Sequence, residues 1–193
     1  TLIAIGTSSN KITFTSNLSS KAAGDWGALT FSASSVDASF DGNGDYASGS
    51  ILKYCIIEYG KGVTMADATP FLFYSTFKYN NYRVISATKS GSSSGTLKIK
   101  YCDIHNNSDD GLKLIYIENS NANTEISYNN VYSNSSTGSG SSYLIHSDYG
   151  SMHNNTLTSN TNSNSSGFIL ARPTNAFYSN TVKSNSGNII KES

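Results

Sequence analysis

Charge is scarce in this chain of 193 residues. Asp, Glu, Lys and Arg together make up 13% of it, and their charges sum to zero, whereas a typical soluble domain carries about 25%. No basic stripe is present, so we expect no nucleic-acid partner. No segment approaches the roughly 18 apolar residues of a membrane-spanning helix, so we expect no transmembrane segment. The 13 Tyr and 8 Phe nevertheless indicate a packed core rather than disorder.

Helical periodicity is also missing, because no stretch repeats apolar residues every 3.6 positions between caps. This excludes alternating strand–helix folds. Cysteine occurs only at Cys55 and Cys102. These residues fall two repeats apart in the pattern described below, about 9.6 Å for stacked strands, whereas a disulfide needs Cα atoms within roughly 7 Å. We therefore predict two free, buried thiols, which say nothing about the redox compartment.

The chain does contain a repeat of nine residues. Six segments align without gaps: LKYCIIEYG (52–60), LFYSTFKYN (72–80), IKYCDIHNN (99–107), ISYNNVYSN (126–134), MHNNTLTSN (152–160) and FYSNTVKSN (177–185). Their starting points differ by 20 to 27 residues. A period of this length is typical of stacked supersecondary units that share one core.

The columns of this alignment predict which residues face the core. The first and sixth positions are always large and apolar, and the ninth is Gly60 followed by five asparagines. We expect the apolar positions to face inward from two very short strands with a bend between them. Asn and Gly tolerate the left-handed backbone geometry of such bends. We also expect stacked Asn side chains to hydrogen-bond along the axis, which would explain why Asn recurs at the fourth and ninth positions.

A third strand precedes the nine-residue frame in each repeat. In the segment 111–119, Leu114 and Tyr116 alternate with Ile115 and Ile117, and this period of two predicts a strand. Each coil would therefore make three strands separated by turns. Strands of successive coils would pair in parallel, because the chain always circles in the same direction.

This coil pattern with Asn at its bends resembles the right-handed parallel β-helix proteins of the pectin-lyase-like superfamily, over roughly residues 51–190. The stretch KITFTSN…GDWGALTF (11–31) is similar to the opening coils of secreted β-helix proteins. The resemblance implies an all-β chain: a single-stranded right-handed parallel β-helix (solenoid) of about seven coils, with three short strands per coil. Residues 1–193 would form one domain, with opening coils at 1–50 and regular coils at 51–193. The fold itself does not specify an activity.

The predicted C-terminal end has no cap. The chain stops shortly after the strand GNII (187–190), and no amphipathic segment is available to cover the last coil. An open β-helix end exposes unpaired backbone groups and apolar side chains. We therefore expect this end to be covered by further residues of a longer chain or by another subunit.

The enzyme motifs of the superfamily are not found. The resemblance to pectate lyases would imply acids stacked on neighbouring coils to hold calcium, but the outward fifth and seventh columns contain one acid each, Asp103 and Glu58. Polygalacturonases use an Asn-Thr-Asp motif and a Gly-His-Gly. Here the Asn-Thr pairs are followed by Leu157 and Val182, and no Gly-His-Gly occurs.

One polar cluster remains as a candidate catalytic site. The run CDIHNNSDDG holds Asp103, His105, Asp109 and Asp110 within one coil. These side chains could form a small catalytic site or bind calcium weakly through oxygen ligands. The other interpretation is a solvated loop in which the Asp residues stabilise the turn before Gly111. We predict no metal or other cofactor beyond this weak possibility of calcium.

Aromatic residues provide the candidate ligand-binding positions. The second column is expected to point outward, and exposed aromatic rings stack on sugars or anchor interfaces. Such rings could equally reflect the high β-propensity of tyrosine. The candidates are Phe73, Tyr132, Tyr143, Tyr149 and Tyr178. The third column, with Tyr at positions 54, 74, 101 and 128, is interpreted as a stacking ladder that stabilises the coil. Glu58 and Lys78 are predicted to form an ion pair between coils.

The sequence thus favours a non-catalytic module of a secreted or cell-surface protein, which mediates polysaccharide adhesion or surface structure. Its Ser- and Asn-rich, weakly charged composition is common in such proteins. The expected partners are polysaccharide or other subunits of the same protein. Two alternatives stay open. One is a carbohydrate-active enzyme, similar to polysaccharide lyases or glycoside hydrolases. The other is a self-assembling filament subunit that stacks head to tail, since contacts that do not close generate fibres.

Overall fold

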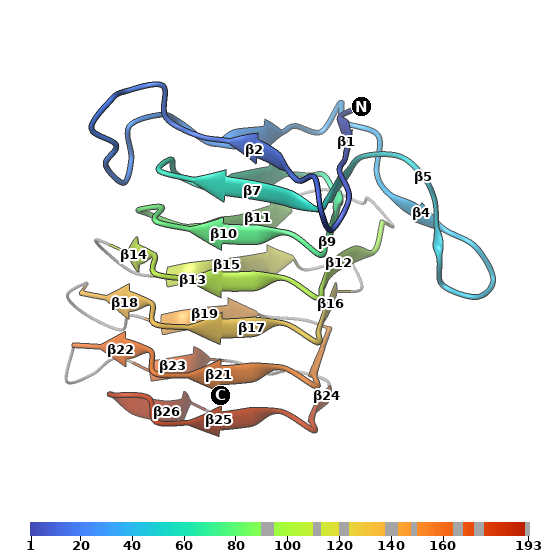
Figure 1. The fold of residues 1–193 in the computed structure, drawn as a ribbon. Coiled ribbons are helices and arrows are strands. Elements are labelled where there is room, and N and C mark those ends of the chain that lie inside the picture. The colour runs from blue at the N-terminus through green and yellow to red at the C-terminus, as the bar shows by residue number, and fades with distance from the viewer. Residues whose placement is uncertain are drawn as a thin grey trace.

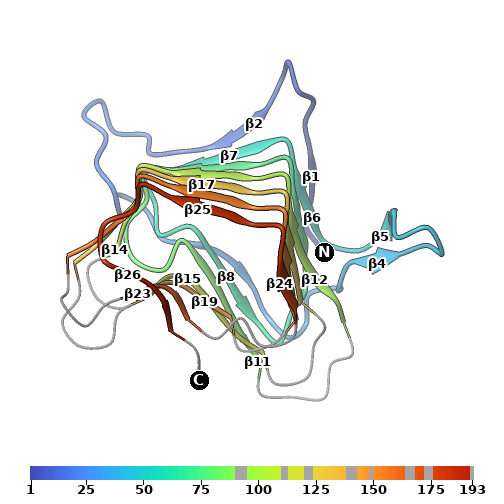
Figure 2. The same cartoon turned by 90° about the horizontal axis from the view of Figure 1, so that it is seen from below.

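The computed structural model describes residues 1–89, 95–109, 113–119, 124–137, 143–147, 150–163, 168–171 and 176–191. All regular structure in these ranges is β-strand, so none of it offers a helix that could cross a bilayer. Three sheets of seven parallel strands form the walls of a solenoid (Figure 1). Seen along the stack, equivalent strands lie over one another around a common interior (Figure 2). The prediction of an all-β fold with parallel strands is confirmed.

Each wall takes its strands in chain order, as parallel stacking of repeats requires. Sheet A consists of β1 (Ile3–Ile5), β6 (Ile51–Lys53), β9 (Phe71–Phe73), β12 (Leu97–Lys100), β16 (Thr124–Ser127), β20 (Ser151–His153) and β24 (Ala176–Tyr178). Sheet B consists of β2 (Ile12–Phe14), β7 (Cys55–Glu58), β10 (Thr76–Lys78), β13 (Asp103–His105), β17 (Asn130–Tyr132), β21 (Thr156–Thr158) and β25 (Thr181–Lys183).

The third wall carries the longer strands. Sheet C consists of β3 (Leu29–Phe31), β8 (Val63–Ala66), β11 (Ile85–Lys89), β15 (Lys113–Asn119), β19 (Tyr143–Ser147), β23 (Phe168–Ala171) and β26 (Asn188–Lys191). A small parallel sheet lies between sheets B and C and consists of β14 (Ser108–Asp109), β18 (Ser135–Ser136) and β22 (Thr161–Asn162). An antiparallel hairpin, β4 (Ser39–Phe40) and β5 (Tyr46–Ser48), stands apart from the walls.

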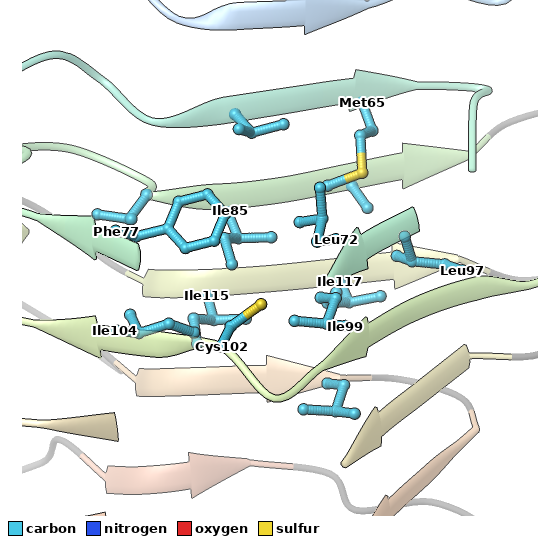
Figure 3. Packing of buried hydrophobic residues seen from close by; sticks show 14 of the residues in the cluster. Met65, Leu72, Phe77, Ile85, Leu97, Ile99, Cys102, Ile104, Ile115 and Ile117 are labelled. Carbon is cyan, nitrogen blue, oxygen red and sulfur yellow. The ribbon is translucent and has the colours of Figure 1, made fainter. Parts of the chain in front are cut away.

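The register of the strands matches the nine-residue alignment. Leu52 pairs with Leu72 in sheet A, and Phe77 pairs with Ile57 and Ile104 in sheet B. These first- and sixth-column side chains are completely buried and form the core with residues of sheet C (Figure 3). Cys55 and Cys102 are free thiols buried in the same core, as predicted. The stacking of equivalent apolar side chains therefore sets the register.

The left-handed bends lie one residue earlier than predicted. Positive φ angles occur throughout the third and eighth columns, which hold tyrosines such as Tyr101 (φ 54°) and serines such as Ser133 (φ 53°). The asparagines of the fourth and ninth columns are not in this conformation. The expectation that the asparagines of these two columns take the left-handed conformation is therefore wrong, although Asn106 and Asn154 adopt it in the eighth and third columns. The ladder of buried Asn side chains provides the physical reason, because each Asn must point into the corner to hydrogen-bond along the axis.

The asparagine ladder was predicted, and the structure confirms it. In the ninth column, the Nδ2 of Asn107 donates to Oδ1 of Asn134 at 3.0 Å, and its backbone N–H donates to the same oxygen at 3.1 Å. Asn80 makes the same two bonds to Asn107 on the preceding side. A second ladder links Asn129 to Asn155 at the other corner. These bonds satisfy backbone groups at the bends, where no strand partner is available.

Trp26 explains why the ninth column begins with glycine. Its indole N–H donates to the carbonyl of Glu58 at 2.9 Å, and its ring lies directly over Gly60. A Cβ atom at Gly60 would come within 2.5 Å of Cε2 of Trp26. Any larger side chain would displace the indole. The backbone N–H of Gly60 still joins the ladder, because it donates to Oδ1 of Asn80 at 3.0 Å.

The strand predicted from the alternation of Leu114 with Ile115 is confirmed as β15, but its side chains do not alternate in exposure. Leu114, Ile115, Tyr116 and Ile117 are all buried. Leu114, Ile115 and Ile117 belong to the core cluster, whereas the ring of Tyr116 is covered by the cationic groups of Arg83 and Lys113.

Candidate functional site

A groove opens between the β4–β5 hairpin and the outer side of sheet A. The hairpin is anchored by a satellite hydrophobic cluster in which Ala38, Ile51 and Phe71 are buried. Phe40 of the hairpin packs edge-on against Phe71, with ring centroids 5.2 Å apart. Figure 2 shows the hairpin projecting beside the strands of sheet A. It therefore forms a wall that the repeat alone would not provide.

The groove has a volume of about 460 Å³, within the range of ligand-binding sites in proteins. Its residues come from the hairpin, from sheet A and from the bend that follows sheet A, and they are Ile5, Gly44, Asp45, Tyr46, Ile51, Lys53, Phe71, Phe73, Tyr74, Lys100 and Tyr101. The floor is apolar and aromatic, whereas two ammonium groups and one carboxylate line the sides. Such a combination suits a ligand that is polar but has apolar faces.

Two lysines line the groove. Lys100 pairs with Glu125, whereas Lys53 has no acidic partner among the described residues. Its Nζ lies 5.4 Å from the ring centroid of Phe73 and 5.7 Å from that of Tyr54. No carboxylate of the described residues lies within ion-pair distance of it. Cation–π contacts leave the three N–H donors of an ammonium group largely available. Lys53 can therefore donate hydrogen bonds to a ligand carboxylate or hydroxyl.

Glu125 organises the cations on the opposite side of the groove. Its carboxylate lies 2.9 Å from Nζ of Lys100 and 4.0 Å from Nζ of Lys98, and it accepts a hydrogen bond of 2.8 Å from the hydroxyl of Ser127. Burial raises the pKa of Glu125, but these hydrogen bonds and charges outweigh it and hold the pKa below its ordinary value. Nε2 of His153 lies 3.6 Å from the same carboxylate. This cluster fixes Lys100 at the rim.

The second column was expected to point outward, and Ser127 does not fit this expectation. Its side chain is fully buried. The reason is that Lys100 and His153, its partners in the neighbouring strands, are much longer and close over it. Ser127 therefore supports the Glu125 cluster from below rather than facing solvent.

The third-column tyrosines form the predicted ladder along one edge of the groove. Tyr74 and Tyr101 are stacked with ring centroids 4.8 Å apart, and the stack continues to Tyr54 at 5.2 Å and to Tyr128 at 4.9 Å. Because the faces of the inner rings pack against each other, ring edges and hydroxyl groups are the parts left exposed. The ladder therefore offers hydrogen-bonding groups at regular intervals rather than surfaces for stacking.

Of the predicted catalytic cluster, Asp103 and His105 lie on one strand, β13, and interact electrostatically, whereas Asp109 lies apart from them in β14. Asp103 is exposed on the outer side of sheet B, whereas Asp109 is buried in the small sheet. His105 is half-buried, and its ring stacks on Tyr132 at 4.7 Å. Burial and the charge of Lys78 lower its pKa, against the opposing effect of Asp103. Asp110 lies outside the described residues. Two carboxylates that shared a reaction would have to face one space, and Asp103 and Asp109 do not.

The candidate ligand-binding aromatics are spread over all three sheets. Phe73 lies in the groove, where it stacks on Phe71 at 4.6 Å. Tyr132 belongs to sheet B, and burial followed by the charge of Asp103 raises its pKa. Tyr143 lies in sheet C with its ring 5.5 Å from that of His146. Tyr178 is exposed and stacks on His153 at 4.8 Å. Tyr149 lies outside the described residues.

Within the described ranges, no three His, Cys, Asp or Glu side chains gather closely enough to hold a metal ion.

The predicted ion pair between coils is present, because Nζ of Lys78 lies 3.2 Å from the carboxylate of Glu58. Both groups belong to sheet B and lie outside the groove.

Sequence reasoning missed the hairpin, and with it the groove. The signal was present in the run Asp41-Gly-Asn-Gly-Asp45, whose glycines are typical of a hairpin turn. Flanking strands of two and three residues were too short to show a pattern.

Comparison with protein-family models, with curated proteins and with solved structures found no significant match.

Proposed function

We propose that this chain is a non-catalytic β-helix module of a secreted or cell-surface protein, and that it binds polysaccharide in the groove beside the β4–β5 hairpin. In this proposal the solenoid is right-handed, has about seven coils and belongs to the pectin-lyase-like group. The observation that carries the function is the groove itself, in which unpaired Lys53 and the edges of Tyr74 and Tyr101 border an apolar floor.

The chemistry of the groove favours a glycan that carries carboxylate groups. Sugars present many hydroxyl groups around an apolar ring face, so they need both hydrogen-bond partners and apolar contact. The ammonium of Lys53 and the phenol hydroxyls supply the first, and Phe73 supplies the second. An acidic sugar would in addition pair its carboxylate with Lys53. The composition, rich in Ser and Asn and poor in charge, supports an extracellular location.

The test is to measure binding to a panel of neutral and acidic polysaccharides by affinity electrophoresis and calorimetry. We expect Lys53→Gln and Phe73→Ala each to weaken binding to an acidic glycan about tenfold, because a charge-assisted hydrogen bond or an apolar contact is lost. Lys183→Gln, at an exposed position of sheet B, is the matched control and should bind like the wild type.

Two results would contradict the proposal. The first is a wild-type protein that binds no polysaccharide of the panel. The second is equal binding by the wild type and the groove variants, which would move the site elsewhere. Cleavage of a bound glycan into shorter products, followed over time by chromatography, would favour the carbohydrate-active enzyme instead.

A further inference from the structure

The tip of the β4–β5 hairpin borders the groove but belongs to no wall of the solenoid (Figure 2). Gly44 and Asp45 line the groove on this side, and backbone hydrogen bonds join Asp41 to both of them across the turn. The strands of the hairpin are only two and three residues long, and an isolated hairpin is at best marginally stable in water. The position of the tip must therefore be fixed by contacts with the rest of the chain.

Lys98 of β12 provides such a contact. Its Nζ donates to the carbonyl of Gly44 at 3.1 Å and lies 3.8 Å from the ring centroid of Phe40. Among the hydrogen bonds that residues 41–45 make within the described part of the chain, this is the one that leads outside the hairpin. The strands of the hairpin are held separately, by the packing of Phe40 on Phe71. Lys98 therefore fixes the tip, which the aromatic cluster does not reach.

The ammonium of Lys98 is itself held from the side of the solenoid. Lys98 is the register partner of Glu125 in β16, and its Nζ lies 4.0 Å from the carboxylate. Only 12% of the Lys98 side chain is exposed, so salt and water screen these contacts little. The groove is lined by Gly44 and Asp45 but not by Lys98. Any effect of Lys98 on the groove must therefore pass through the position of the hairpin.

We propose that Lys98 is a positioning residue of the groove, because it fixes the hairpin tip at a set distance from sheet A before a ligand binds. A wall that is ordered in advance costs a ligand less entropy on binding. In the proposed function Lys53 contacts the ligand, whereas Lys98 holds the wall that the ligand meets. The effect on affinity rests on that proposed function, but the fixing of the hairpin does not and can be measured without a ligand.

Amide hydrogen exchange of the hairpin, followed by mass spectrometry, tests the fixing directly. Lys98→Met keeps the length of the side chain but loses its ammonium. We expect peptides that contain residues 41–48 to exchange about tenfold faster in this variant, because a hydrogen bond from a charged group is lost. Lys98→Arg should restore slow exchange, since a guanidinium can both donate to a carbonyl and pack on an aromatic ring. Peptides of sheet B should exchange as in the wild type.

Two further lysine variants are matched controls for this measurement. Lys100→Met removes the ammonium that lies closer to Glu125 and comes from the same strand, but no hydrogen bond joins Lys100 to the hairpin among the described residues. Lys78→Met removes the ammonium that pairs with Glu58 on sheet B. Neither variant should accelerate exchange in residues 41–48.

The affinity for alginate, a polysaccharide that carries carboxylate groups, tests the consequence for the groove. We expect Lys98→Met to weaken binding by a factor of about 3–10 in calorimetry, because the wall of the groove is no longer ordered in advance. Lys98→Arg should bind within about twofold of the wild type. Lys78 lies outside the groove, so Lys78→Met should bind like the wild type.

Three results would overturn the proposal. Unchanged exchange of the hairpin in Lys98→Met would show that other contacts fix it. Equal acceleration in Lys100→Met would assign the effect to the charges around Glu125 and not to the contact with Gly44. A loosened hairpin with unchanged affinity for alginate would show that its position does not control the groove. If the wild type binds no alginate, the proposed function fails for this glycan, whereas the exchange of the hairpin still decides whether Lys98 fixes it.

Discussion

Asn107 donates two hydrogen bonds to a single oxygen, Oδ1 of Asn134, one from its side chain at 3.0 Å and one from its backbone at 3.1 Å. Its Nδ2 also reaches back to the carbonyl of Phe77 at 2.9 Å. One side chain therefore connects three successive coils. Both asparagines are 2% exposed, so water cannot replace these bonds.

Replacement of Asn107 should therefore lower the free energy of unfolding. In Asn107→Ala, the backbone N–H of Asn80 and the carbonyl of Phe77 lose their buried partner. Each such group costs about 1–3 kcal/mol when left unsatisfied, so we expect the free energy of unfolding to fall by on the order of 3 kcal/mol. Urea denaturation measures this change. Asn130→Ala removes an exposed asparagine from sheet B and should change stability by less than about 0.5 kcal/mol; similar losses in both variants would refute the ladder's role.

The left-handed bends allow a second test at Ser133, which is exposed with φ 53°. A β-branched residue is poorly tolerated in this conformation. We expect Ser133→Val to lower the free energy of unfolding by about 1–2 kcal/mol, whereas Ser133→Gly should be neutral or stabilising because glycine adopts this geometry without strain. Thermal unfolding of the two variants gives the comparison. Equal stability of Val and Gly at this position would show that the bend relaxes.

The tyrosine ladder should contribute measurably to stability. Tyr101 stacks on Tyr74 and Tyr128, and aromatic pairs are worth about 0.5–1.5 kcal/mol each. Tyr101→Asn removes the ring but keeps a residue that tolerates positive φ, so we expect a loss of about 1–3 kcal/mol by urea denaturation. Tyr82→Asn is the control, since Tyr82 also has positive φ (70°) and is 48% exposed. A larger loss in the control would contradict the stacking role.

Acid should weaken the cluster around Glu125. Because its pKa in the folded protein is lowered, the carboxylate stabilises the fold above its unfolded pKa of about 4.3. That contribution is lost as the pH falls through the lower folded value. We expect the wild type to lose stability below about pH 4.3 more steeply than Glu125→Gln, measured as urea midpoints at several pH values. Parallel curves for the two proteins would show that the ion pairs with Lys98 and Lys100 contribute nothing.

The two thiols should be inert in the native protein. Burial raises the pKa of Cys55 to about 11 and that of Cys102 to about 12, so almost no thiolate forms at neutral pH. We expect a thiol reagent such as an aromatic disulfide to react with neither cysteine in the folded state and with both in urea. Cys55 lies 3.5 Å from the carbonyl of Ala4 in the first strand of sheet A. Fast reaction of Cys55 in the native state would therefore show that this strand opens.

Much of the framework could be predicted because its residues repeat. Stacked columns make each inward position visible several times in the sequence, and the buried thiols, the Asn and Tyr ladders and the pair Glu58–Lys78 followed from that alignment. The positive φ of Tyr101 could not be read in the same way. Local preference disfavours tyrosine in this conformation, and only the stacking of whole coils overrides it.

The candidate site was less accessible from sequence than the framework. Phe73 was identified from its column, but Asp45 and Tyr46 belong to a hairpin that occurs once and has no repeat to reveal it. Long-range contacts decide this part of the molecule, because the hairpin is fixed by Phe71, which follows it by more than twenty residues. Because the hairpin occurs only once, the sequence contains no second copy with which it could be aligned.

The β4–β5 hairpin is attached to the solenoid without belonging to its repeat. It packs on Phe71 and Ile51 from outside, and neither the asparagine nor the tyrosine ladder passes through it. Residues 41–45 at its tip can therefore vary in length and sequence while the coils stay unchanged. The hairpin side of the groove can therefore be altered independently of the solenoid wall that it faces.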